Sequence, residues 1–336
     1  MKKNVFIVAE AGVNHNGSLA LAKKLVAAAK IAGADAVKFQ TFKASSLAAA
    51  SAPKAAYQVR TTGSSDSQFQ MLKKLELGGL AHKVLWDYCR KLGIRFLSSP
   101  FDPESVDFLL KLGLHIIKVP SGEITNLPYL RKVGAARRKI ILSTGMATLK
   151  ETGAALKVLT TAGTARRNIV LLHCSTEYPA PMKDVNLSAM LTLAKKFKVR
   201  VGYSDHTEGI EVSVAAAALG AEVIEKHLTL DRKMKGPDHK ASLEPREFRD
   251  MVKAIRNIEA ALGNGIKRPS LCELRNAKVV RKSLTAIKSI AKGEAFSRDN
   301  IAPMRPAGGM SPMLWDKVIG CQAPSRFQPG EKVKLT

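Results

Sequence analysis

The hydrophobic pattern of this chain alternates between short β-like runs and longer helix-like segments. Eight apolar runs have the length of a strand: Val5–Ala9, Ala34–Phe39, Ile94–Leu97, His115–Val119, Ile140–Ser143, Ile169–His173, Val199–Tyr203 and Glu222–Ile224. Helical patterns lie between and after them, for example Leu19–Ala32, Ala81–Leu92, Pro103–Leu112, Leu149–Ala162, Leu187–Phe197, Ile210–Leu219 and Pro245–Leu262. Eight strand–helix pairs are the number that a closed (β/α)8 TIM barrel requires.

The barrel pattern stops near Gly263-Asn-Gly265, so we expect a catalytic barrel domain over residues 1–265. A basic, irregular linker is expected over residues 266–282, followed by a mostly β module over residues 283–336. A module of about fifty residues is small for independent stability, so it should dock on the barrel or on a partner subunit. The long Ala/Ser-rich connection of residues 41–67 is typical of a lid or an oligomer-contact loop.

Composition narrows the class of protein. The 336 residues carry 54 Lys+Arg against 28 Asp+Glu, a net charge of +26, which favours anionic small molecules or nucleic acid as partners. The basic residues are scattered and aromatic residues make up only 5%, so no specific nucleic-acid partner is expected. The chain has no signal-peptide start, no apolar stretch that could span a membrane, and four separate cysteines without a CxxC pair. We therefore expect a cytoplasmic protein with reduced thiols.

Polar side chains that can do chemistry follow nearly every predicted strand. Because the carboxyl ends of parallel strands meet at one rim, these side chains should converge there. Strand-to-loop transitions are polar in most proteins, and this explains the serines. It does not explain Lys38 and Lys118, each of which closes an apolar run. A lysine inside the barrel must be paired or must face a ligand anion, because an isolated buried charge is costly. With nearby hydroxyls, these two cations suit a phosphate plus a carboxylate.

Two histidines, His206 and His227, end successive strands of the same β–α–β segment. They would bind a divalent metal ion, or else act as ordinary hydrogen-bonded structural residues. Glu10 and Glu123 are the carboxylates that could transfer protons. Glu225 would be either a partner of a metal-bound water or the ion-pair partner of Lys226.

Seven motifs stand in order along the chain: Ala9-Glu-Ala-Gly-Val-Asn-His-Asn-Gly17, Val37-Lys-Phe-Gln40, Lys118-Val-Pro-Ser-Gly-Glu123, Leu142-Ser-Thr-Gly-Met146, Leu172-His-Cys-Ser-Thr-Glu-Tyr-Pro179, Gly202-Tyr-Ser-Asp-His206 and Gly236-Pro-Asp-His-Lys240. Together they closely resemble the sialic acid (N-acetylneuraminate) synthase family, which includes legionaminic and pseudaminic acid synthases. The last segment, with Arg305-Pro-Ala-Gly-Gly-Met-Ser-Pro312, resembles the appended SAF (antifreeze-like) domain of that family.

This resemblance implies a condensation of phosphoenolpyruvate with an N-acetylated hexose, giving a nine-carbon 2-keto acid and phosphate. By similarity, phosphoenolpyruvate would be held by Lys38, Lys118, Ser121, Ser143, Thr176 and Ser204. The sugar would be oriented by Gln40, Glu123, Tyr178, Asp238 and, from the partner subunit of a domain-swapped homodimer, Arg305. His206 and His227 would hold a divalent ion, manganese in the first place and magnesium or cobalt as alternatives. Glu10 would assist the attack of water.

Four interpretations remain open at this point. N-acetylmannosamine as the sugar would give N-acetylneuraminate, and this is the first expectation. A 2,4-diacetamido-2,4,6-trideoxyhexose would give legionaminic or pseudaminic acid. Another phosphoenolpyruvate–aldose condensing synthase would lack the terminal module. A basic scaffold that binds acidic polysaccharide or nucleic acid would not need the two histidines.

Overall fold

The computed structural model describes residues 4–336 and divides into two compact units at the boundary between Gly263 and Asn264. In the first unit, all eight expected strands are present, and they are parallel. Their bounds are β1 Phe6–Gly12, β2 Ala36–Thr41, β3 Arg95–Pro100, β4 Ile116–Val119, β5 Lys139–Ser143, β6 Ile169–Cys174, β7 Arg200–Asp205 and β8 Val223–His227. Strand β1 pairs with both β2 and β8, and β3 lies beside β4, so the sheet forms the predicted TIM barrel.

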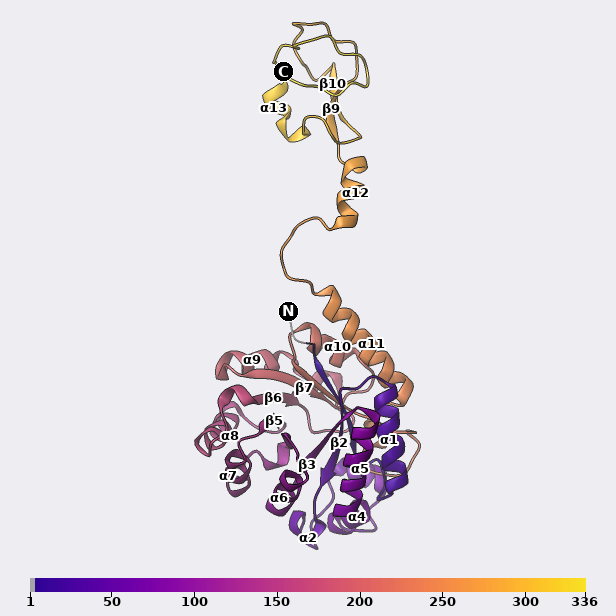
Figure 1. Cartoon of the computed structure of the whole chain (residues 1–336), viewed down its shortest axis with the longest axis vertical. Helices are drawn as coiled ribbons and strands as arrows, with labels where there is room; N and C mark the ends of the chain where they lie inside the picture. The colour runs from indigo at the N-terminus through magenta and orange to yellow at the C-terminus, as the bar shows by residue number, and fades with distance from the viewer. Residues whose placement is uncertain (1–3) are drawn as a thin grey trace. The chain divides into compact units, whose positions relative to one another are not determined.

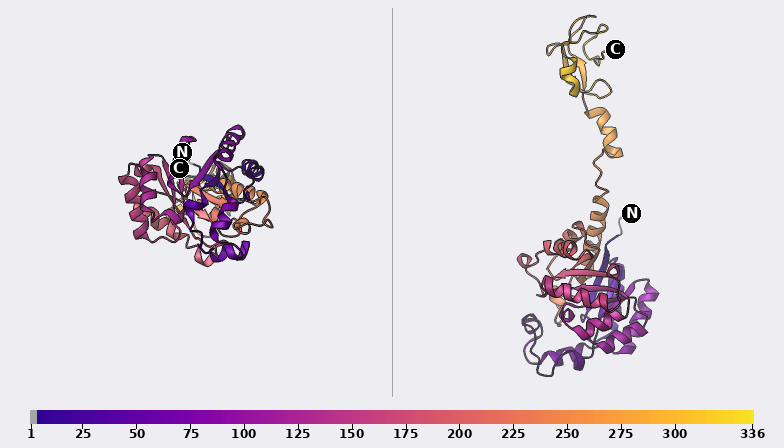
Figure 2. Two further views of the ribbon diagram at one scale, coloured as in Figure 1. Left: turned by 90° about the horizontal axis from the view of Figure 1, so that it is seen from below. Right: turned by 90° about the vertical axis from the view of Figure 1, so that its left-hand side faces the viewer.

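Helices follow the strands and lie on the outside of the sheet (Figure 1, Figure 2). They are α1 Leu19–Ile31, α5 Gly79–Leu92, α6 Pro103–Lys111, α7 Leu127–Ala135, α8 Leu149–Thr161, α9 Ser188–Phe197, α10 Glu211–Ala218 and α11 Pro245–Ala261. Side-chain caps start several of them: Asp102 accepts the Ser105 N–H before α6, and Thr148 accepts the Glu151 N–H before α8. Short 3-10 turns lie at Ser121–Glu123, Arg166–Asn168, Met182–Asp184 and His239–Ala241.

The strand alternation decides which side chains enter the barrel. A layer of apolar residues fills the interior, among them Val8, Ala36, Ile141 and Val223. Side chains two positions further along a strand point to the same face, so Glu10, Lys38, Ser143 and Glu225 enter the interior beyond that layer. The outward-facing strand residues pack against the helices in the larger core. Chemistry is thereby confined to the carboxyl end of the barrel.

The long connection between β2 and α5 contains three short helices, which the hydrophobic pattern does not predict. They are α2 Ala44–Leu47, α3 Ala56–Thr62 and α4 Gln68–Leu75. Ser67 caps α4, and its reciprocal bond with Gln70 completes a capping box. Met71 and Leu75 of α4 are buried in a small cluster with Val13 and Phe42. This inserted segment therefore has a packed apolar face of its own.

The second unit has a small core of nine buried apolar residues, including Phe296, Ile301 and Phe327. Its regular elements are α12 Leu271–Val280, β9 Ser283–Ala286, β10 Ile301–Met304 and α13 Trp315–Val318, with a 3-10 turn at Pro312–Leu314. Strands β9 and β10 pair antiparallel. The expectation of an irregular segment was wrong for residues 271–280, which form a helix capped by the Ser270 side chain.

Candidate functional site

A cavity of about 430 Å³ opens at the carboxyl ends of the strands. Twelve of the residues predicted for the site line it: Glu10, Lys38, Gln40, Lys118, Ser121, Ser143, Thr176, Tyr178, Ser204, His206, His227 and Asp238. Glu123 is not among the lining residues, although its neighbour Gly122 is; its carboxylate accepts a hydrogen bond of 2.6 Å from the Asn126 amide. Arg305 belongs to the second unit, where its Nε donates to the Val280 carbonyl oxygen.

The floor of the cavity is a buried network of two lysines and two carboxylates. The Lys38 ammonium lies 2.6 Å from Glu10 Oε2 and 3.0 Å from Ser99 Oγ. Glu225 Oε1 lies 3.2 Å from the Lys118 ammonium and 3.7 Å from that of Lys38. The interpretation of Glu225 as the ion-pair partner of Lys226 was wrong, because Lys226 pairs with Asp205 at 3.0 Å. The sequence did not predict the ion pairs of Glu225 with Lys118 and Lys38.

Burial and mutual charge set the protonation of this network. Burial raises the pKa of Glu10 to about 7 in spite of the neighbouring Lys38. Burial lowers the pKa of Lys118. For Glu225, burial is outweighed by Lys118 and Lys38, so its pKa lies below the usual value. One carboxylate thus stays ionised while the other titrates near neutral pH. The lysines are poised to exchange these partners for a substrate anion.

Hydroxyl groups surround the two lysines. Ser204 Oγ donates to Glu225 Oε1 at 3.1 Å, and Ser121 Oγ accepts the Gly145 N–H at 3.0 Å. Ser143 Oγ is buried and has no hydrogen-bond partner among the described residues. A buried hydroxyl without a partner is costly, so this oxygen is placed for a ligand. At Gly145, a Cβ atom would lie 2.6 Å from Thr176 Cγ2. Only glycine lets these loops approach so closely.

The two imidazoles lie side by side above the network. Their ring centroids are 5.4 Å apart, and the Tyr178 ring lies 4.1 Å from that of His206. His206 Nδ1 contacts the Ser175 carbonyl oxygen, an arrangement that leaves the Nε2 lone pair available. Burial lowers the pKa of His206 to about 4 and that of His227 well below its usual value. Both rings are therefore neutral, the form that binds metals.

The residues fit a divalent ion that draws part of its coordination from substrate or water. His227 Nδ1 is buried without a hydrogen-bond partner, and the nearest carboxylate oxygen, Oδ2 of Asp238, is 3.9 Å away. Within residues 4–336, no group of three or more His, Cys, Asp or Glu side chains is arranged to hold a metal. A two-imidazole site leaves open positions, as catalytic metal sites require.

Several lining residues were not in the predicted set. Tyr57, Gln58 and Gln68 come from the inserted segment, as do the apolar residues Leu47, Met71, Leu72 and Leu75. Tyr57 packs on Tyr178 with a centroid distance of 4.8 Å. The length of the segment was a signal for a lid, but no motif pointed to these particular side chains. Their contribution is visible only in three dimensions.

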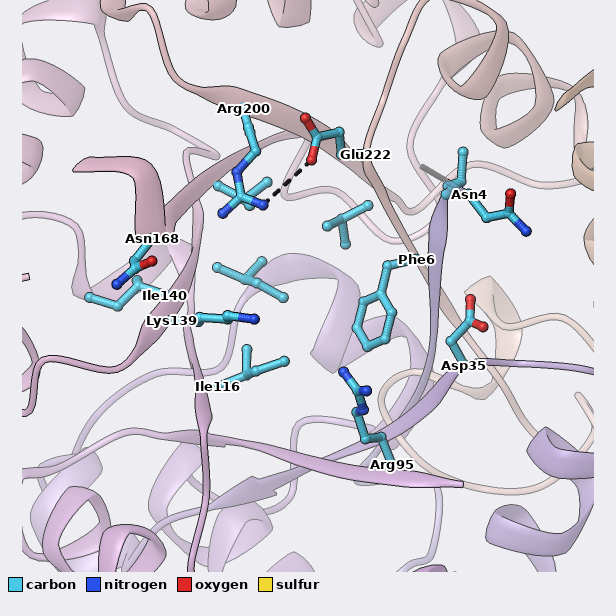
Figure 3. Close-up of a pocket in the computed structure, with 14 residues that line it drawn as sticks. Asn4, Phe6, Asp35, Arg95, Ile116, Lys139, Ile140, Asn168, Arg200 and Glu222 are labelled. Carbon is cyan, nitrogen blue, oxygen red and sulfur yellow. Dashed lines mark ion pairs between the residues drawn. The ribbon is translucent and has the colours of Figure 1, made fainter. Parts of the chain in front are cut away.

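A second cavity, of about 310 Å³, lies at the opposite end of the barrel (Figure 3). It is lined by residues at the amino ends of the strands, such as Phe6, Arg95 and Lys139. Arg200 and Glu222 form an ion pair there at 3.5 Å. None of the predicted site residues lines this cavity. Of these two cavities, the carboxyl-end one is the candidate site.

A TIM barrel with buried lysines, hydroxyl groups and neutral imidazoles at its carboxyl rim defines an enzyme that handles an anionic substrate. The family model named NeuB family matches residues 25–267. The chain is 55% identical over 332 residues to N,N'-diacetyllegionaminic acid synthase of Campylobacter jejuni, covering 99% of each chain. It is 46% identical over 327 residues to the protein of the same name from Legionella pneumophila, covering 97% of this chain and 92% of that one.

Similarity to a solved structure supports the same family. The crystal structure of N-acetylneuraminic acid (sialic acid) synthetase from Leptospira borgpetersenii, in complex with citrate, matches with a TM-score of 0.72 and 34% identity. The match covers 82% of this chain and 90% of that one. The chain belongs to the NeuB family, the sialic acid synthases that its motifs resemble. No helix among the described residues is both long and apolar enough to cross a membrane.

Proposed function

We propose that this enzyme condenses phosphoenolpyruvate with a 2,4-diacetamido-2,4,6-trideoxyhexose and water, giving a legionaminic-type nine-carbon 2-keto acid and phosphate. The observation that carries the proposal is the 55% identity, over 99% of both chains, to the N,N'-diacetyllegionaminic acid synthase of Campylobacter jejuni. The reaction class is the one expected from the sequence. The favoured sugar is the alternative given there, and not N-acetylmannosamine.

Phosphoenolpyruvate would bind at the floor of the cavity. Its phosphate and carboxylate would engage Lys38 and Lys118, which are now neutralised by Glu10 and Glu225. The hydroxyls of Ser121, Thr176 and Ser204 and the unpartnered hydroxyl of Ser143 would complete the anion site. The low exposure of this floor strengthens each charge-assisted hydrogen bond.

In the reaction, C3 of phosphoenolpyruvate attacks the aldehyde carbon of the open-chain sugar and forms the new C–C bond. Water then adds to the cationic C2 that results, and Glu10 accepts its proton. Collapse of this adduct to the 2-keto acid breaks the C2–O bond and releases phosphate. Burial holds the pKa of Glu10 at about 7, so the carboxylate is both available at neutral pH and basic enough for this step. A divalent ion, manganese in the first place, would bind His206 and His227 and supply a Lewis acid for the aldehyde oxygen.

The sugar would lie across the mouth of the cavity. Gln40, Tyr178 and Asp238 would contact the hydroxyl groups of the sugar. This is supported by the 3.4 Å contact of Gln40 Nε2 with Glu10 Oε1 and by the positions of Tyr178 and Asp238 beside His227. Glu123 would act by positioning the loop of Gly122 through its bond with Asn126.

The second unit would be an SAF domain that presents Arg305 to the sugar in the partner subunit of a domain-swapped homodimer. The resemblance of Arg305-Pro-Ala-Gly-Gly-Met-Ser-Pro312 to the family's terminal domain supports this assignment.

Phosphate release tests the proposal. The enzyme with manganese and phosphoenolpyruvate is offered 2,4-diacetamido-2,4,6-trideoxymannose and N-acetylmannosamine in parallel. Release with the diacetamido sugar at a higher kcat/KM supports the proposed substrate, and a preference for N-acetylmannosamine overturns it. Release with neither sugar would point to another aldose acceptor.

A further inference from the structure

The cavity at the carboxyl end of the barrel has two chemically different sides. One side is the polar floor, which the strand ends supply. The other side comes largely from the inserted segment and is apolar: Leu47 on α2 and Met71, Leu72 and Leu75 on α4. Val13 and Phe101 continue the same side. The reaction as proposed above uses none of these residues, and we call this set of six the apolar wall.

The apolar wall is a built surface and not a chance exposure. Val13, Met71 and Leu75 are buried in a separate hydrophobic cluster, and Leu47, Leu72 and Phe101 are partly buried against it. A second tie is the buried Lys54 ammonium, which pairs with Asp66 and donates to the Gly63 carbonyl oxygen at 2.9 Å. The wall is thus held in place by its own core, with three half-buried apolar side chains facing the cavity.

Amide groups lie at the edge of the apolar wall. Gln68 Nε2 donates to Gln58 Oε1 at 3.3 Å, and Gln58 Nε2 donates to the Tyr57 hydroxyl at 3.3 Å. All three residues line the cavity. An acetamido group needs this combination, because its planar amide requires hydrogen-bond partners and its methyl group requires apolar contact.

We propose that the apolar wall is the specificity subsite for the far end of the sugar, where it receives the C4 acetamido methyl and the C6 methyl group. This inference rests on the proposed function and names the part of the site that selects the sugar. In this proposal the aldehyde end of the sugar lies beside His206 and His227. The far end of the sugar then extends away from the strand ends, toward the residues of the inserted segment that line the cavity.

The same wall excludes the more polar sugar. N-acetylmannosamine carries a hydroxyl group at C6, for which an apolar wall offers no hydrogen-bond partner, and at C4 it lacks the acetamido methyl group that the wall would contact. Burying a hydroxyl without a partner is costly, whereas burying a methyl group is favourable. One methyl group in a hydrophobic pocket is worth roughly 10–200-fold in kcat/KM. Two methyl groups should therefore give a preference of at least roughly a hundredfold when both contacts are made in full, and loss of one contact should remove at least roughly tenfold of it.

The test substitutes Leu72, which is only half-buried, so that the fold survives. The kcat/KM values for 2,4-diacetamido-2,4,6-trideoxymannose and for N-acetylmannosamine are measured in wild type, Leu72→Asn, Leu72→Met and Leu80→Asn. Leu80 on α5 is 84% exposed, outside the cavity, and provides the matched control. We expect Leu72→Asn to reduce the preference for the diacetamido sugar roughly tenfold. Leu72→Met and Leu80→Asn should keep the preference, and the KM for phosphoenolpyruvate should stay unchanged in all.

Different results would overturn the proposed substrate and the proposed subsite. A wild-type preference for N-acetylmannosamine would overturn the proposed substrate. A wild-type preference for the diacetamido sugar that persists unchanged in active Leu72→Asn, and also in Leu47→Asn, would overturn the apolar wall while leaving the proposed function intact. Equal loss of activity with both sugars would show a structural role for Leu72 and would also overturn the specificity subsite.

Discussion

The substitution Glu225→Gln should destabilise the empty enzyme and strengthen its response to an anion. Glu225 Oε1 is 3.2 Å from the Lys118 ammonium, and within the described part of the chain no other carboxylate forms an ion pair with Lys118. Lys38 keeps Glu10 at 2.6 Å in the variant. The change is nearly isosteric, so its effect is mainly the loss of one buried negative charge.

The magnitude can be bounded in two ways. Removing one partner of a buried ion pair costs about 3–5 kcal/mol. Lys118 can also avoid being an unpaired buried charge by losing its proton. Deprotonating a lysine of ordinary pKa at pH 7.5 costs about 4 kcal/mol. The expected loss of stability is therefore roughly 3–4 kcal/mol. At about 2–3 °C per kcal/mol for a domain of this size, Tm should fall by roughly 6–12 °C.

Thermal unfolding at pH 7.5 and low salt, with and without phosphoenolpyruvate, provides the assay. Phosphoenolpyruvate should raise Tm more in Glu225→Gln than in wild type, because it replaces the missing negative charge. The control is Glu222→Gln, which breaks the partly exposed ion pair with Arg200 at the other end of the barrel and should change stability by less than about 1 kcal/mol. A Tm for Glu225→Gln within about 2 °C of wild type would refute the view that this charge compensates Lys118.

Three further predictions concern catalysis. His227→Gln should abolish manganese-dependent phosphate release while phosphoenolpyruvate still raises Tm; turnover retained at the wild-type rate would exclude His227 as a metal ligand. Burial raises the pKa of Glu10 to about 7, and the proposed base is its ionised form, so kcat/KM should rise with pH through about 7. A pH profile that is flat from pH 6 to 8 would contradict the assignment of Glu10 as the base. Arg305→Ala should raise the sugar KM. At a sugar concentration far below that KM, mixing Arg305→Ala with Lys38→Met subunits should restore activity if Arg305 acts across a dimer, whereas no restoration in mixed dimers would place it in its own subunit.

The barrel could be predicted from sequence because its strands are short apolar runs with polar ends, repeated eight times. The same pattern located most of the cavity, since Lys38 and Lys118 could not close apolar runs without a partner. The carboxylate that pairs with Lys118 was harder to assign from the sequence. Glu225 stands next to Lys226 in the chain, but alternation in β8 sends the two side chains to opposite faces, where Lys226 meets Asp205.

Other features depended on contacts that local patterns do not encode. The helices of the inserted segment are short, with four to eight residues. Their hydrophobic pattern therefore spans too few turns to predict a helix. Helix α12 did carry a signal, because Ser270 and Glu273 form a capping box, but the basic residues around it favoured the linker interpretation. Exposed helices of this kind have no buried face and leave little hydrophobic pattern.

The site separates the chemistry of the reaction from the choice of sugar. The groups that we propose to react stand on strand ends, where ladders of backbone hydrogen bonds hold Glu10, Lys38 and His227 in place. The sugar-selecting surface that we propose lies largely on the inserted segment, where Met71 and Leu75 pack against Val13 and Phe42, the residues that follow β1 and β2. Substitutions in that segment can therefore change the accepted sugar without disturbing the phosphoenolpyruvate site. This arrangement predicts that Leu72 variants alter kcat/KM for the sugars while Tm shifts induced by phosphoenolpyruvate remain those of wild type.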